Sequence, residues 1–238
     1  MDLLVAGPTP GAVRIGLALP LSGPLALTAP SALDLAEPAA EECTAAGWAG
    51  DQRLELVAID SGRAPAVVAA EVTALQSAGA LAGLVGLHTS DVHRAVERAW
   101  EGRGTYVFTP PHEGGRSRPG VRRLGPGPRA QHAPALVWLV AQRSARRWVL
   151  LGTDYVWPRA VHGAARSVLT GLGAEVVGEA LVPFGPGDPG PLLDLVVRSR
   201  ADAVLLSVVG RNLALFHREF APILVKTGRK PELAEETA

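Results

Sequence analysis

The stretch from Arg147 to Val182, "RWVLLGTDYVWPRAVHGAARSVLTGLGAEVVGEALV", contains the pattern that decides the fold. An apolar run of strand length at 147–152 is followed by a segment of helical period at about 158–172, and a second strand-like run covers 175–184. The order strand, helix, strand predicts a βαβ unit with parallel strands. Within the predicted helix, apolar residues recur at the spacing of a stripe packed on a sheet, namely Val161, Ala165, Val168, Leu169 and Leu172.

The same alternation extends to both sides of this stretch. Strands are predicted at 13–19, 53–60, 80–86, 105–108 and 202–210, with helices at 31–46, 64–79, 90–102, 132–144, 190–200 and 212–224. This pattern predicts an α/β fold class with two doubly wound parallel-sheet lobes.

The segment between residues 110 and 129 is dense in Gly, Pro and Arg, and only residues 121–125 can form an edge strand there. We therefore expect a first lobe at residues 1–125 and a second, partial lobe at 126–238. The tail from Lys226 is polar, and we expect it to be frayed.

Composition narrows the class of protein. The 238 residues contain 23 Lys and Arg against 23 Asp and Glu, so no net charge would attract nucleic acid or an anionic membrane surface. Cys43 is the only cysteine, which excludes an internal disulfide. Asp2, Pro8 and Pro10 interrupt the apolar N-terminus, so no export signal is recognised. These features predict a cytoplasmic protein as given, or a periplasmic or extracellular one if a leader has been removed.

Motifs for catalysis and cofactor binding are missing from the sequence. The six histidines are scattered without metal-ligand spacing, and no Gly-rich phosphate loop follows a strand. No GxSxG elbow is present, and Ser22 in "LSGP" is interpreted as a turn residue. The sequence therefore predicts a protein that is not an enzyme, with no metal and no cofactor. An amidase-like hydrolase that uses Ser90 is kept as a remote alternative.

Candidate binding residues follow the strands, because ligands of doubly wound sheets bind at the carboxyl ends of strands. Aromatic and hydroxyl-bearing side chains gather at these positions, and they suit a small polar molecule held by stacking and a few hydrogen bonds. The candidates in the two lobes are His88, Ser90, Phe108, Thr109, Tyr155 and Trp157.

Several segments resemble type I periplasmic binding proteins, the fold of branched-chain amino acid binding proteins. "VRIGLALPLSGPLA" (13–26) and "LELVAID" (54–60) are similar to the N-terminal segments of proteins of that family. The whole resemblance covers residues 13–222. "GLHTSDVHRAV" (86–96), "PPHEGG" (110–115) and the "DYVWPR" motif (154–159) are similar to its amide- and urea-binding subfamily. The resemblance implies a two-lobed clamp that closes about a hinge on a solute. Chains of this family are longer, so the second lobe and the hinge are expected to be incomplete.

The resemblance also implies residue roles. Ser90 matches a first-lobe serine that meets the ligand carbonyl, and His88 and Phe108 fall at aromatic wall positions. Pro110 falls where amino acid binders use a backbone N–H, which proline lacks. This argues against a free amino acid ligand.

Tyr155 and Trp157 match paired second-lobe aromatics that cover the ligand. If the chain stays extended, their rings face the same way and form a slot for a flat neutral group. Two interpretations of Trp157 stay open: the ligand slot, and a structural staple between the helix entry and the sheet.

The resulting hypothesis is a non-enzymatic domain that binds a small neutral amide, urea or related amino-acid-like solute. It would work as the substrate-binding protein of an ABC transporter, with a permease as partner, or as a cytoplasmic sensor with an antiterminator-type regulator. The alternative is a truncated remnant or regulatory interaction module whose cleft does not close. An unpaired sheet edge would favour a homodimer.

Overall fold

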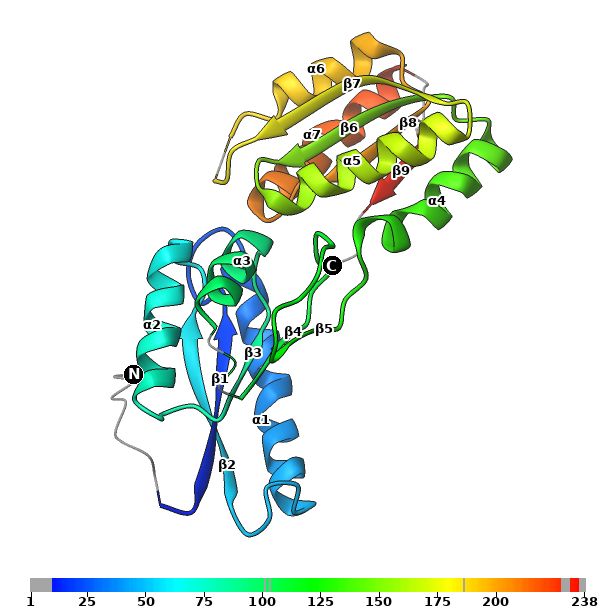
Figure 1. The fold of residues 1–238 in the computed structure, drawn as a ribbon. Coiled ribbons are helices and arrows are strands. Elements are labelled where there is room, and N and C mark those ends of the chain that lie inside the picture. Colours follow the sequence, from blue (N-terminus) through cyan, green and yellow to red (C-terminus); the bar gives the residue numbers. More distant parts are fainter. Residues whose placement is uncertain (1–9, 101, 103, 186, 228–231, 236–238) are drawn as a thin grey trace. The chain divides into compact units, whose positions relative to one another are not determined.

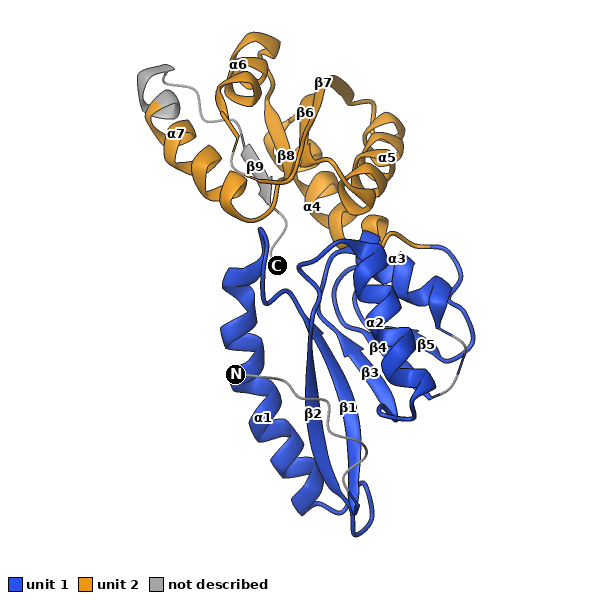
Figure 2. Ribbon diagram, turned by 90° about the vertical axis from the view of Figure 1, so that its left-hand side faces the viewer, with its two compact units in different colours: residues 1–111, 115–125 blue, residues 112–114, 126–238 orange. Residues whose placement is uncertain are grey.

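The computed structural model describes residues 10–227 and 232–235, apart from residues 101, 103 and 186. The chain divides into two compact units (Figure 2). Unit 1 comprises residues 1–111 and 115–125, and unit 2 comprises residues 112–114 and 126–238.

Unit 1 is built on a parallel sheet of five strands in the order β2-β1-β3-β4-β5. Along the chain its elements are β1 (Ala12–Leu19), η1 (Ala26–Thr28), α1 (Ala29–Ala45), β2 (Arg53–Asp60), α2 (Pro65–Ser77), β3 (Gly83–Gly86), α3 (Ser90–Ala99), β4 (Thr105–Phe108) and β5 (Val121–Arg123).

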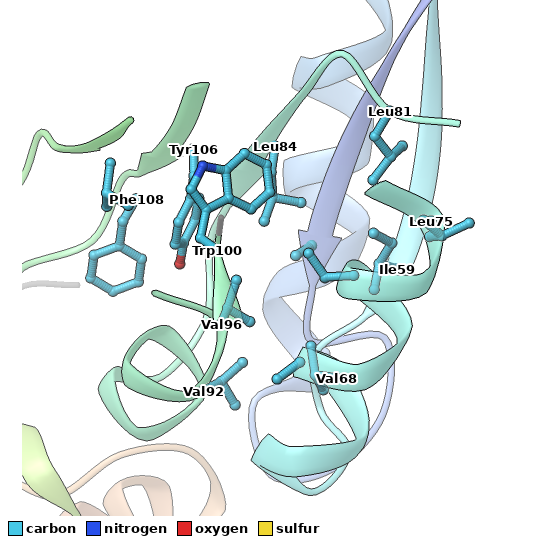
Figure 3. Packing of buried hydrophobic residues seen from close by; sticks show 14 of the residues in the cluster. Ile59, Val68, Leu75, Leu81, Leu84, Val92, Val96, Trp100, Tyr106 and Phe108 are labelled. Atoms are coloured by element: carbon cyan, nitrogen blue, oxygen red, sulfur yellow. The ribbon is translucent and has the colours of Figure 1, made fainter. Parts of the chain in front are cut away.

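The main core of unit 1 lies between the sheet and the helices α2 and α3 (Figure 3). Its largest members are the buried rings of Trp100, Tyr106 and Phe108. The helix α1 lies on the other side of the sheet, where it closes a smaller cluster around Leu17 and Leu19 (Figure 1). Strands β1 and β2 therefore have helices on both sides.

Unit 2 contains a parallel sheet of four strands in the order β7-β6-β8-β9. Its elements are α4 (Pro128–Arg143), β6 (Arg147–Thr153), α5 (Val156–Gly171), β7 (Glu175–Val182), α6 (Gly190–Ser199), β8 (Ala203–Ser207), α7 (Arg211–Thr227) and β9 (Glu232–Glu235).

The sheet of unit 2 has an apolar cluster on each face. Buried residues of α4 and α5 pack on one face with Trp148 and Leu150, and those of α6 and α7 pack on the other with Val149 and Leu151. The alternation of residues along β6 between the two clusters follows the period of two along a strand. Both faces being apolar explains why β6 and β8 are continuous apolar runs in the sequence.

The predicted fold class is confirmed, since both units have parallel sheets joined through helices. The predicted stripe of α5 is also found, with Val161, Ala165, Val168 and Leu169 buried against the sheet. Helix α5 ends at Gly171, and Gly173 then adopts a positive φ of 67°, a conformation that glycine reaches without strain.

Two expectations are wrong. The tail from Lys226 was expected to be frayed, which is wrong for Glu232–Glu235, because these residues form β9 and pair in parallel with β8. Residues 228–231 and 236–238 of this tail lie outside the described residues. Backbone hydrogen bonds along a sheet edge explain how a polar segment without apolar periodicity becomes a strand. The segment after β6 was expected to stay extended through Trp157, whereas α5 begins at Val156.

Candidate functional site

The four first-lobe candidates lie together at the carboxyl ends of β3 and β4. These strands are neighbours, and Gly86 at the end of β3 is in register with Phe108 at the end of β4. Thr109 closes this edge, because its N–H and its Oγ1 each donate to the Gly86 carbonyl at 3.0 Å. The rings of His88 and Phe108 are 5.2 Å apart between centroids. The structure thus brings together residues that are separated by a helix in the sequence.

His88 is buried rather than set on an exposed rim, with 5% of its surface exposed. Its ring lies over Gly86, where an added Cβ would come within 2.4 Å of Nε2. His88 Nδ1 lies 3.2 Å from the carbonyl oxygen of Thr89, which can only accept, so this nitrogen carries the proton.

A chain of hydrogen bonds continues from His88 into the core. Its Nε2 lies 3.2 Å from the Tyr106 hydroxyl, which in turn lies 2.8 Å from His93 Nδ1. A neutral His88 protonated at Nδ1 accepts at Nε2, so Tyr106 donates to His88 and accepts from the N–H of His93. His93 also stacks on Phe108 at 4.0 Å. His88 is therefore held from both sides in one orientation.

The charge of His88 follows from its surroundings. Burial lowers the pKa of His88 to about 4 and outweighs the hydrogen bond to Thr89 and the nearby carboxylate of Asp91, both of which raise it. At neutral pH this side chain is an uncharged imidazole.

Ser90 is the first residue of α3 and is 97% buried, with 3% of its surface exposed. Among the described residues its hydroxyl has no hydrogen-bond partner. Thr89, rather than Ser90 or Asp91, is the N-cap residue of α3, and no side chain caps this helix. The first-turn N–H groups of a helix lack intrahelical partners, so the start of α3 offers donors beside a free hydroxyl.

Phe108 and Thr109 are less available than their positions in the sequence suggest. Phe108 is fully buried in the core of unit 1. The Thr109 hydroxyl donates to Gly86, which leaves only its lone pairs for another partner.

The loops after β1 and β2 are joined by Asp60. Its carboxylate accepts from the Ser22 hydroxyl at 2.6 Å and from the N–H groups of Ser22 and Gly62. Burial alone would raise the pKa of Asp60, but these hydrogen bonds and Arg63 outweigh it and lower the pKa. The Ser22 hydroxyl therefore holds a turn together, in agreement with its interpretation as a turn residue.

Tyr155 and Trp157 differ in burial, although both pack against the apolar cluster of α4, α5 and the sheet in unit 2. Tyr155 is the extended N-cap residue of α5, and its ring lies 4.9 Å from Phe184. Trp157 lies in the first turn of α5 and is buried in the core between α4, α5 and the sheet. Its indole N–H has no hydrogen-bond partner among the described residues.

The ring that faces Tyr155 is Phe184, a residue that sequence reasoning missed. Phe184 follows β7, which pairs with β6, so the loops after these strands adjoin. Its position two residues past the end of a neighbouring strand was the available signal. Asp154, at the start of the same loop, forms an ion pair with Arg159 at 2.6 Å.

A second polar cluster in unit 2 was also missed. His162 Nδ1 lies 2.8 Å from Glu179 Oε1, and its Nε2 lies 3.2 Å from Ser207 Oγ. The order of partners is that of a hydrolase triad, but Ser207 is fully buried and its hydroxyl donates to the Leu151 carbonyl. No substrate can reach this oxygen, so the cluster links α5, β7 and β8.

In the described ranges no group of three or more His, Cys, Asp or Glu side chains could hold a metal ion. Within the same residues no helix has both the length and the apolar character needed to cross a membrane.

The chain is similar to known proteins in sequence and in fold. A family model described as periplasmic binding protein matches residues 12–222. A solute-binding protein of an ABC transporter from R. palustris, in complex with 4-hydroxybenzoate, superposes with a TM-score of 0.75 at 18% identity, over 94% of this chain and 61% of that one.

Two further solved structures are similar. An ABC transporter substrate-binding protein from Sphaerobacter thermophilus has a TM-score of 0.70 at 23% identity, over 94% of this chain and 62% of that one. A leucine-binding protein from Thermotoga maritima has a TM-score of 0.70 at 18% identity, over 94% and 63%. This chain therefore spans less than two thirds of the length of these proteins.

Proposed function

The chain belongs to the periplasmic binding protein family, and from this premise we propose that it binds a small neutral solute of the amide or urea type. The family consists of solute-binding proteins without catalytic activity, which confirms the expectation that the protein is not an enzyme. The choice of an amide or urea as the solute rests on the residues at the carboxyl ends of β3 and β4 in unit 1.

The observation that carries this proposal is the hydroxyl of Ser90, a residue that is 3% exposed at the start of α3 and whose hydroxyl has no partner among the described residues. Such a hydroxyl and the first-turn N–H groups suit the carbonyl oxygen of an amide or urea. His88, whose pKa is lowered to about 4, contributes no positive charge at neutral pH. A neutral solute fits this edge better than a carboxylate, which would require a cation or further donors.

We propose that unit 2 contributes the ring of Tyr155, with Phe184 behind it. The two rings are 4.9 Å apart and tilted by 37°, so Phe184 supports the face of Tyr155. Trp157 is buried in the core, so it would not contact the solute itself. It would act indirectly, by setting where α5 begins. His88, Phe108 and Thr109 would act in the same indirect way in unit 1, and Ser90 would make the direct contact.

A carboxylate solute is the main competing proposal. The R. palustris protein is in complex with 4-hydroxybenzoate and the Thermotoga maritima protein is a leucine-binding protein, and both of these solutes carry a carboxylate. Pro110 speaks against this solute class, because it cannot donate a backbone N–H.

Isothermal titration calorimetry with acetamide, urea, leucine and 4-hydroxybenzoate tests the proposal. We expect heat of binding with acetamide or urea only, and Ser90→Ala should weaken that binding about tenfold, the loss expected for one hydrogen bond. Ser167→Ala, which removes an exposed hydroxyl on α5, is the matched control and should have no effect. Binding of leucine or 4-hydroxybenzoate alone would replace the amide proposal by the carboxylate proposal.

A remnant or regulatory module is the remaining alternative. It would give no heat with any of the four solutes although circular dichroism shows a folded protein. Cell fractionation then separates the two settings of a binding protein: a receptor for an ABC permease is found in the periplasm, whereas a sensor paired with an antiterminator-type regulator is found in the cytoplasm.

A further inference from the structure

The turn that leads to Ser90 joins β3 to α3 and comprises residues 87–89. Its first residue, Leu87, donates its N–H to a carbonyl of β1 at 2.9 Å. The carbonyl of its last residue, Thr89, accepts from the N–H of His93 in α3 at 2.9 Å. The turn is therefore tied to β1 at one end and to α3 at the other, and its middle residue is held through a side chain.

That middle residue is His88, and Tyr106 of β4 holds its ring. The Tyr106 hydroxyl lies 3.2 Å from His88 Nε2 and 2.8 Å from His93 Nδ1. The carbonyl of Thr89 takes the proton of His88 Nδ1, so the neutral ring accepts at Nε2 and Tyr106 is the donor. One hydroxyl thus bridges a residue of the turn and a residue of the helix.

Ser90 lies between the two histidines that this hydroxyl bridges. His88 precedes Ser90 by two residues, and His93 follows it by three. Both imidazoles also contact the ring of Phe108, with centroids 5.2 Å and 4.0 Å away. The segment that carries the Ser90 hydroxyl is therefore fixed to β4 on both sides, by hydrogen bonds and by packing.

Packing alone does not require a hydroxyl at position 106. Tyr106 is fully buried, and its ring lies beside that of Trp100 at 5.7 Å between centroids (Figure 3). Phe108, two residues further along β4, is also fully buried and fills its place without a polar atom. A buried hydroxyl costs free energy unless it is hydrogen-bonded. Its bonds to the two histidines offset this cost, and a buried network of this kind favours one arrangement of the groups that it joins.

Gly86 gives the His88 ring the room to reach this hydroxyl. A Cβ at this last position of β3 would lie 2.4 Å from His88 Nε2, the atom that accepts from Tyr106. It would also lie 3.2 Å from the Tyr106 ring. The missing side chain therefore lets His88 fold back over β3 and meet β4.

We propose that Tyr106 is a positioning residue of the solute site, whose hydroxyl holds His88 and His93 and thereby sets where the Ser90 hydroxyl lies. Because Ser90 is the residue proposed to contact the solute, this role rests on the proposed function. Tyr106 is fully buried and acts from behind the site. A binding site keeps its geometry when packing and hydrogen bonds lock the residues that support it. Loss of the hydroxyl should therefore weaken solute binding without removing a contact to the solute.

Tyr106→Phe removes one oxygen atom and leaves the ring in place. Calorimetry with acetamide and urea should show a dissociation constant raised about tenfold, because the two histidines lose the partner they share. Thr73→Val is the matched control, since the Thr73 hydroxyl donates at 2.7 Å to the Ala69 carbonyl inside α2 of the same unit. This variant also loses a hydroxyl, and its dissociation constant should equal that of the wild type. Circular dichroism checks that each variant is folded.

Two substitutions at His93 test the same role if Tyr106→Phe does not fold. Asparagine keeps an N–H donor near the place of Nδ1, whereas leucine is apolar and offers Tyr106 no partner. Both substitutions lose the stacking on Phe108. His93→Asn should therefore bind acetamide or urea about tenfold more tightly than His93→Leu. Equal affinities of these two variants would overturn the proposal.

NMR of the ring nitrogens of His88 gives a readout that needs no solute. The wild type should show one neutral tautomer with the proton on Nδ1, and Tyr106→Phe should show both tautomers, because Nε2 has lost its donor. A single unchanged tautomer in Tyr106→Phe would overturn the proposal, and so would a tautomer mixture with unchanged solute affinity. A wild type that binds neither acetamide nor urea overturns the proposed function instead, and the spectrum then still decides whether Tyr106 holds the turn.

Discussion

His162 Nδ1 lies 2.8 Å from Glu179 Oε1, which ties helix α5 to strand β7 inside unit 2. A carboxylate only accepts, so this bond is donated by the imidazole. Arg166 donates to the other oxygen of Glu179 at 2.5 Å. Glu179 is thus held by two side chains of α5, and we expect it to contribute to the stability of unit 2.

Glu179→Gln tests this contribution. Burial alone would raise the pKa of Glu179, but the hydrogen bonds from Arg166 and His162 outweigh it and lower the pKa. We expect the substitution to lower the free energy of unfolding by about 1–2 kcal/mol at pH 7. Because the carboxylate is favoured in the folded state, wild-type stability should fall as pH decreases below 4.5, the ordinary pKa of this group, and the variant should lack this part of the decrease.

Urea unfolding followed by circular dichroism at several pH values measures both effects. Glu175→Gln is the control, because Glu175 lies on β7 like Glu179 and is an exposed member of an ion pair with Arg147 of β6. It should change the free energy of unfolding by less than about 0.5 kcal/mol. Equal losses in the free energy of unfolding for Glu179→Gln and Glu175→Gln would contradict the stabilising role of Glu179.

His88 should remain uncharged throughout the neutral and mildly acidic range. Its pKa is lowered from 6.5 to about 4, so the unfolded chain binds a proton before the folded protein does. Stability from this group is complete above pH 6.5 and decreases as pH falls from 6.5 towards 4, by on the order of 3 kcal/mol in total. The ring protons of His88 followed by NMR should not titrate between pH 8 and pH 5, and a midpoint near 6.5 would show that the ring is exposed to solvent.

Gly86→Ala should disturb the edge of unit 1 without touching Ser90 directly. The added Cβ would lie 2.4 Å from His88 Nε2 and 3.2 Å from the Tyr106 ring, so His88 must move. We expect a loss of about 1–3 kcal/mol in the free energy of unfolding, the usual cost of overpacking. Gly163→Ala is the control, since no atom lies within 4 Å of the added carbon in α5, and it should stabilise the helix by about 1 kcal/mol. A thermal melt tests both expectations, because Gly86→Ala should lower the melting temperature and Gly163→Ala should raise it.

Two tryptophans of unit 2 should respond differently to replacement by phenylalanine. Trp148 Nε1 donates to the Ala145 carbonyl at 2.9 Å, whereas the indole N–H of Trp157 has no partner among the described residues. Trp148→Phe loses a hydrogen bond in addition to volume, so it should cost about 1 kcal/mol more than Trp157→Phe in chemical unfolding. If Trp157→Phe also abolishes solute binding while the protein stays folded, Trp157 contacts the solute, against its interpretation as a core residue.

Periodicity in the sequence predicted the α-helices of both units and their strands other than β9. The stripe from Val161 to Leu169 and the apolar run of β6 are local patterns, and the structure buries the residues of both. The first-lobe candidates were also brought to one edge as expected, because the ends of neighbouring parallel strands meet. The start of α5 was missed, because the sequence from Tyr155 to Trp157 is compatible with either an extended chain or a helical turn. Burial of the Trp157 indole in the core of unit 2 selects the helical turn.

What the sequence determined by itself was the set of elements, their parallel pairing class and the residues at the strand ends, because these follow from the spacing of apolar side chains along the chain. Only the tertiary structure decided which polar side chains meet, as in His88 with Tyr106 and His162 with Glu179. It also decided that β9 pairs with β8. These features depend on contacts between distant segments, whose free energies no local pattern encodes.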